Sequence, residues 1–160
     1  MTKNGGGGML VNKFRHYSSE ARIVQMDSRI KEVSYFGPMT WGTFATLRAP
    51  VLAASADADA LLIRMDSSLW LMDQASALPA EQYPDGCPPA AVICRDDPRE
   101  VAFWKNYTAA VSERGISRLV FRSSQLDAAR EWVDASARLW HRARLERQRS
   151  MSALCFAPLS

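Results

Sequence analysis

The stretch AAVICRDDPREVAFWKNYTAAVSERGISRLVFRSSQLDAAREW, residues 90–132, carries the local signals that decide the fold. Its first five residues are apolar, lie between a Pro-Pro pair and a charged turn, and predict a buried strand. The next four residues, 97–100, have the pattern of a helix start. Asp97 can be the N-cap, Pro98 the first helical residue, and Glu100 the glutamate that closes a capping box. A helix is therefore expected to begin at Pro98.

The helix predicted at this point has an apolar stripe and a clear end. Apolar side chains recur along it at spacings of three and four: Val101, Trp104, Tyr107 or Thr108, and Val111. Gly115 stands where a left-handed C-terminal cap is favoured, so the helix should end near Arg114. Residues 119–121 predict a second strand, and Ser124 with Asp127 can cap another helix. Two strands joined by a helical crossover are normally parallel, so a parallel sheet edge is expected.

The segment before this stretch predicts an N-terminal hairpin and one further helix. Residues 21–36 partition apolar and polar side chains onto two faces, which is typical of a β-hairpin. The Gly37-Pro38 pair is expected to end the hairpin, and Thr40 can cap the helix that follows. Pro50 falls inside that helical pattern and should kink or divide it.

The middle and the end of the chain complete the expected set of elements. Residues 60–64 predict a central buried strand, and residues 65–74 an extended segment, with a helical start as the alternative. Residues 79–89 are rich in proline and predict a surface loop. A last helix is expected over residues 125–148, with a stripe at Leu126, Ala129, Val133 and Ala137.

Length and composition are those of one domain. A chain of 160 residues with 48% hydrophobic residues is expected to form one core. We assign that core to a single α/β domain over residues 21–150, with residues 1–20 as a flexible or edge lead and residues 151–160 as a tail apolar enough to pack back. The fold class expected is a mixed, largely parallel sheet, fed by the hairpin and covered by helices.

Composition also indicates where the protein is located and whether it binds a metal or a cofactor. No apolar run is long enough to span a bilayer, so no transmembrane segment is expected. Glycines follow Lys3 where a secretory signal would be apolar, and this favours a cytoplasmic location. Cys87, Cys94 and Cys155 are odd in number and widely spaced, which favours free thiols over a disulfide framework or a zinc site. No cofactor and no metal are expected.

Catalytic residues are sparse. The two histidines, His16 and His141, lie far apart and lack flanking motif residues, so neither predicts a triad or a metal site. Cys94 precedes a helix, but four residues separate it from Arg99, and two of them are acidic. A phosphatase-like loop needs five residues there, so a buried thiol is the better interpretation.

The end of the last helix is rich in arginine: Arg138, Arg142, Arg144, Arg147 and Arg149. A solvated charged face is the commonest reason for such a run. Its anion-binding candidates are Arg138, Arg142 and Arg149. A net charge of +3 is too mild to require nucleic acid, and no specific nucleic-acid partner is expected.

Tryptophans fall on or beside the apolar stripes of the predicted helices. Core packing explains them, but Trp41, Trp104 and Trp132 are also candidates for an apolar pocket between helices and sheet. Such a pocket would take a small apolar molecule or a lipid.

Several segments together resemble a known domain. They are the turn at residues 37–40 into a helix containing Phe44, the strand at residues 61–63, and residues 115–121 followed by Ala128, Ala129 and Trp132. Over residues 22–139 the order of elements is similar to the STAS domain of bacterial anti-sigma-factor antagonists and of SpoIIAA-like, STAS/SEC14-like small proteins. The resemblance implies a non-enzymatic regulatory or adaptor domain that acts through a protein partner or self-association.

The resemblance also implies a phosphorylated serine in an Asp-Ser-Ser-Gly turn at a helix start. Asp66, Ser67 and Ser68 match its first three residues, and Leu69 replaces the glycine. If the equivalent turn instead begins at Asp73, no phosphorylatable serine remains there. The partner-binding candidates implied are Asp66, Ser67, Ser68 and Asp73, with Thr40 at the neighbouring helix start. Binding of an apolar molecule is the alternative function, and an enzyme ranks last because no nucleophile and base converge.

Overall fold

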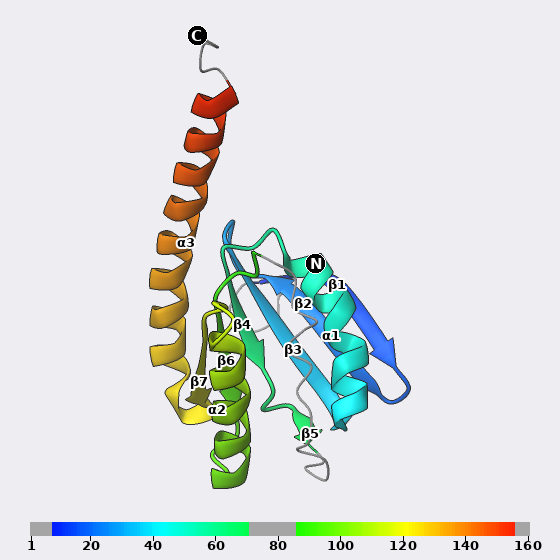
Figure 1. The fold of residues 1–160 in the computed structure, drawn as a ribbon. Helices are drawn as coiled ribbons and strands as arrows, with labels where there is room; N and C mark the ends of the chain where they lie inside the picture. Colours follow the sequence, from blue (N-terminus) through cyan, green and yellow to red (C-terminus); the bar gives the residue numbers. More distant parts are fainter. Residues whose placement is uncertain (1–7, 71–85, 156–160) are drawn as a thin grey trace.

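The computed structural model describes residues 8–70 and 86–155. Within these residues the elements follow in the order β1 (Met9–His16), β2 (Ser19–Gln25), β3 (Ile30–Met39), α1 (Trp41–Ser55), β4 (Ala60–Arg64), β5 (Ser68–Trp70), β6 (Ala90–Cys94), α2 (Pro98–Ser112), β7 (Arg118–Arg122), the short 3-10 helix η2 (Ser123–Gln125) and α3 (Leu126–Cys155). Figure 1 shows their arrangement around one sheet.

The sheet is mixed and largely parallel, as predicted. Its strands lie in the order β1-β2-β3-β4-β6-β7, with β5 beside the end of β3. The first three strands are antiparallel neighbours, which confirms the hairpin. β3, β4, β6 and β7 are parallel neighbours, and β4 has the central place expected of it. The lead contributes β1, which pairs with β2 and therefore belongs to the sheet.

The antiparallel pairing of β2 with β3 ends at Phe36, so the hairpin stops at the Gly37-Pro38 pair as predicted, although the strand itself does not. β3 continues to Met39, with Gly37 at a φ of +88° inside it. A Cβ there would lie 2.6 Å from the backbone oxygen of Ser18, so glycine lets the two chains approach. Beyond this point β3 pairs in parallel with β5, where the predicted extended segment is found. Residues 71–74, and the part of the predicted loop before Gly86, lie outside the described residues.

α1 is continuous although Pro50 lies inside it, so of the two expected effects, a kink or a division, the division does not occur. The helix starts as predicted, because the Thr40 hydroxyl accepts a hydrogen bond from the backbone nitrogen of Thr43 at 3.1 Å. Phe44 before the proline and Val51 after it are both buried in the core. Packing of both halves on the sheet compensates for the hydrogen bond that proline cannot donate.

α2 begins as the sequence predicts and ends slightly earlier. The Asp97 carboxylate accepts a hydrogen bond from the backbone nitrogen of Arg99 at 2.8 Å, and Pro98 opens the helix. The last helical residue is Ser112, and Gly115 has the positive φ expected of a residue that ends a helix, +80°.

α3 is longer than predicted at its C-terminal end. It runs from Leu126 to Cys155, beyond the expected end at residue 148. Ser124 lies in η2 and donates a hydrogen bond to Asp96 at 3.0 Å, so it does not cap α3. The predicted tail begins inside the helix, and Leu154 is 78% exposed there. Packing back of this residue is therefore a wrong prediction, and residues 156–160 lie outside the described residues.

Helices cover the two faces of the sheet unequally (Figure 1). α1 and α2 lie on one face, where their side chains join those of β2, β3 and β6 in the larger core cluster. α3 lies on the other face through its predicted stripe, and its partners come from β3, β4 and β6: Ile30, Leu62, Ala91 and Ile93. Neither these helices nor any other within the described residues has the length and apolar character needed to cross a membrane.

Candidate functional site

On the face that carries α3, no helix of the described residues covers β2 and the middle of β3. Alternate residues of a strand point to the same face, so Glu32, Ser34 and Phe36 follow Ile30 on this side of β3. They lie opposite Val24, Arg22 and Glu20 of β2 in the antiparallel register. This half of the face is polar, whereas the half beneath α3 is apolar.

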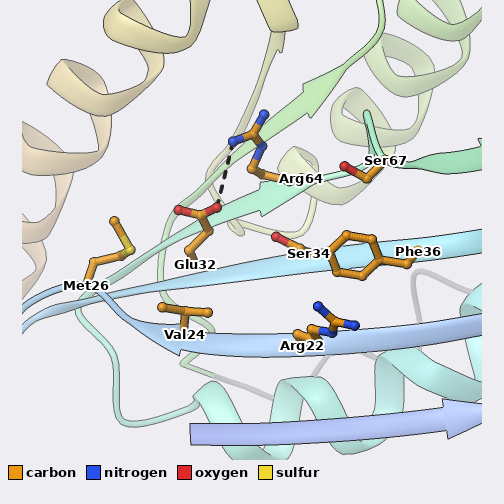
Figure 2. Close-up of a pocket in the computed structure, with 8 residues that line it drawn as sticks. All are labelled: Arg22, Val24, Met26, Glu32, Ser34, Phe36, Arg64 and Ser67. Atoms are coloured by element: carbon orange, nitrogen blue, oxygen red, sulfur yellow. Dashed lines mark ion pairs between the residues drawn. The ribbon is translucent and has the colours of Figure 1, made fainter. Parts of the chain in front are cut away.

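A hollow of about 280 Å³ lies on this open half (Figure 2). Its lining comes from β2, β3, β4 and the turns beside them: Arg22, Val24, Met26, Glu32, Ser34, Phe36, Arg64 and Ser67. Charged, hydroxyl, aromatic and apolar groups thus meet over a few strands. This is the candidate binding site of the protein.

Glu20 holds three cations at one rim of the site. Its carboxylate lies 3.1 Å from Lys13, 3.2 Å from Arg15 and 2.5 Å from Arg22. Burial works against the charge of this carboxylate, but hydrogen bonds from the three cations outweigh burial and hold the pKa of Glu20 below its ordinary value. The guanidinium of Arg22 also lies 4.6 Å from the centre of the Phe36 ring.

Arg64 is engaged in a similar way at the other rim. Its guanidinium forks onto the Asp66 carboxylate, with Nη2 to Oδ2 at 2.6 Å and Nε to Oδ1 at 3.2 Å. Hydrogen bonding to Asp66 raises the pKa of Arg64 against the opposing effect of burial. Glu32 lies farther from this guanidinium, at 3.9 Å.

The partner-binding candidates implied by the resemblance fall at one edge of the sheet. Ser67 is exposed in the turn after β4 and lines the hollow, whereas Ser68 is buried and donates its hydroxyl to the carbonyl of Met65 at 2.7 Å. Thr40 lies at the same edge, because the end of β3 pairs with β5. Asp73 lies outside the described residues. Ser68 opens a strand, not a helix, which departs from the turn that the resemblance implies.

The three tryptophan candidates do not gather around one pocket. Trp41 and Trp104 belong to the aromatic cluster of α1 and α2, whereas Trp132 packs beside Phe121 on the opposite face. A cavity beside Trp104 measures about 20 Å³, which is about the space of one water molecule.

Cys94 is fully buried, as the interpretation as a buried thiol requires. Burial, assisted by the nearby charges of Glu100 and Asp96, raises the pKa of the Cys94 thiol to about 11. A thiol in this state is neutral at physiological pH and a poor nucleophile.

A buried ion-pair cluster, which we call the clamp, joins the residue before β4 to α3 and was not predicted from the sequence. Asp59, 2% exposed, lies 3.1 Å from His141 Nδ1 and 2.9 Å from Arg144 Nη2. The spacing of three residues places both partners on one face of α3. An acidic residue directly before a buried strand was the only local signal, and it does not identify a partner eighty residues away along the chain.

The last part of α3 extends past the sheet (Figure 1). We call residues 145–155 the arm; they correspond to about 16 Å of helix. Leu145, Met151 and Leu154 on the arm are 38%, 66% and 78% exposed. The anion-binding candidates Arg138, Arg142 and Arg149 are exposed and share one stripe, since they are four and seven residues apart. Arg147 instead lies over the Trp140 ring, at 5.4 Å.

No protein-family model matches the chain. No curated protein matches it either. Among residues 8–70 and 86–155, no group of three His, Cys, Asp or Glu side chains is placed to hold a metal ion.

Proposed function

We propose that the protein is a non-enzymatic, STAS-like regulatory or adaptor domain that acts by binding another protein through the arm of α3. The observation that carries the proposal is the exposure of Met151 and Leu154, 66% and 78%, on a helix that has left its own sheet. Exposed apolar side chains that form one patch mark an interaction surface, and Met151 and Leu154 share one helix face because they are three residues apart. The open polar half of the sheet supplies a second surface on the same domain.

A protein is the partner that suits the arm best. Its charged residues are Glu146, Arg147 and Arg149, so its net charge is two minus one, or +1. That charge is small for a segment that binds phosphate backbones or anionic lipid. Apolar side chains on a short helix suit the groove of a protein, where a few anchors supply most of the binding energy.

Ser67 is the residue through which phosphorylation would regulate the domain. The resemblance implies such a switch, and of the two matching serines Ser67 has the accessible hydroxyl. A phosphate would add up to about two negative charges beside Asp66 and would compete for Arg64. The polar sheet surface would change its charge as a result.

Site-specific crosslinking tests the role of the arm. A photoreactive amino acid at position 154 should capture one defined protein in the cells that make this chain, whereas the same group at Leu119, 43% exposed on β7, should not. An adduct of twice the chain's mass would assign the arm to self-association. Equal capture from both positions, or none from position 154, would contradict the proposal.

Intact-mass analysis tests the switch separately. Protein isolated from those cells should contain a fraction heavier by one phosphate, and the Ser67→Ala variant should lack it. A phosphate that persists in Ser67→Ala, or a complete absence of phosphate from the wild-type chain, would remove Ser67 from the proposal.

A further inference from the structure

The hollow on the open sheet face has the size of a small binding site. Its volume of about 280 Å³ is close to the lower limit of ligand pockets, roughly 300 Å³. A long side chain or a small polar molecule fits such a space. Val24 and Met26 give one wall an apolar surface, and Ser34 places a hydroxyl between Glu32 and Phe36.

Both arginines of the hollow already make a close ion pair with a carboxylate outside it, and Arg22 shares its carboxylate with Lys13 and Arg15. Arg22 is paired with Glu20 at 2.5 Å, and Arg64 is paired with Asp66 through two hydrogen bonds. Neither carboxylate belongs to the lining. An anion entering the hollow would therefore compete with an existing close ion pair at either arginine.

Glu32 lacks an equally close partner. Its side chain is 15% exposed, and within the described part of the chain its carboxylate has one ion pair, with Arg64 at 3.9 Å, and accepts no hydrogen bond. Arg64 makes its shorter contacts with Asp66. Figure 2 shows one oxygen of Glu32 toward Arg64 and the other turned toward the side of Met26. A mostly buried carboxylate with a free acceptor oxygen favours a cation.

We propose that this hollow binds a cationic group on an aliphatic stem, an alkylammonium or alkylguanidinium, with Glu32 as its counter-ion. The charged end lies at the free oxygen of Glu32, on the side of Met26 and away from Arg64. The stem lies along Val24 and Met26, which shield it from water. Two sources carry this chemistry: a lysine or arginine side chain of a protein, and a free diamine.

Titration of the full-length chain with n-butylammonium, followed by NMR of the backbone amides, tests the site. Saturable shifts are expected in β2 and β3 around Val24 and Ser34. The Glu32→Gln variant should bind at least about tenfold more weakly, because a hydrogen bond to a charged group is lost. The matched variant Glu131→Gln, on an exposed position of α3, should bind like the wild type.

Two further probes decide the outcome even if Glu32→Gln fails to fold. Neutral n-butanol has nearly the same shape and should bind at least about tenfold more weakly than the ammonium. Inorganic phosphate should leave the same amides unshifted. Equal binding of butanol, equal binding by Glu32→Gln, or shifts with phosphate alone would overturn the proposal.

The source of the cation follows from two more titrations. Tighter binding of a lysine blocked at both backbone ends would assign the hollow to a protein side chain, and tighter binding of putrescine would assign it to a free diamine. If neither the blocked lysine nor putrescine binds, the proposed site is wrong. The proposed role of the arm is unaffected by that result, because the arm lies on another part of the molecule.

Discussion

The two faces of the sheet differ in how they are covered. Two helices close one face over an aromatic and aliphatic core, in which Phe44 lies near the rings of Trp104 and Tyr107. On the other face a single helix covers the apolar half, and ion pairs occupy the rest. The closed face thus supplies most of the hydrophobic stabilisation, and the open half of the other face is available for binding.

The same substitution on each face tests this division most strongly. Phe44→Ala should cost about 3–5 kcal/mol of unfolding free energy, because Phe44 is 4% exposed and its loss leaves a cavity. Phe36→Ala should cost about 1 kcal/mol, since Phe36 is half-buried and stacks mainly on Arg22. Urea unfolding followed by tryptophan fluorescence measures both. Equal costs would mean that the open half also contributes to the core.

The clamp on α3 gives the next largest effect. Arg144→Gln should destabilise the fold by about 1–3 kcal/mol, because the buried Asp59 then loses the guanidinium and keeps His141 as its one paired side chain among the described residues. Arg142→Gln, two residues earlier and exposed, should change stability by less than about 0.5 kcal/mol. Urea unfolding compares them, and similar values would show that the ion pair does not secure α3.

The ion pairs of the open half should make the unfolding free energy decrease at acidic pH. The pKa of Glu20 is lower in the folded state, so its contribution is present above the ordinary carboxyl pKa and is lost as pH falls through the folded pKa. Its three cations are 40–73% exposed, which limits the effect to less than about 1 kcal/mol. Glu20→Gln should flatten this part of the pH profile of urea unfolding. An unchanged slope would assign the acid sensitivity to other carboxylates.

The arm should contribute least to stability. Leu154→Gln should leave the unfolding free energy within about 0.5 kcal/mol of the wild type, because Leu154 is 78% exposed. Thermal and urea unfolding of the purified chain measure this. A larger loss would mean that the arm packs within the protein or between copies, and dilution of the sample would separate these two cases.

Elements with their own local chemistry were predictable. Asp97 and Pro98 predict the start of α2, Thr40 predicts the start of α1, and the all-apolar run at residues 90–94 predicts β6. Each signal acts within one turn or one strand, so neighbouring residues are sufficient to recognise it. The parallel order of β6 and β7 followed from the helix between them.

Sites assembled across the chain were less predictable. Ser67 was named from a resemblance, but its position beside Arg22 and Glu32 depends on the pairing of β2, β3 and β4. The three tryptophan candidates appeared equivalent in the sequence, yet the sheet separates Trp132 from the others. The local preference of Pro50 predicts a kink or a break, yet α1 is continuous, and both of its halves are packed on the sheet.

The sequence by itself determined the fold class, the starts of α1 and α2 and the apolar stripes, because caps and periodicity are properties of neighbouring residues. Tertiary structure alone decided which half of a face stays open, which carboxylate lacks a close partner and which part of α3 has a sheet beneath it. These features depend on distances between residues far apart in the chain. Such distances exist only once the strands have paired and the helices have packed.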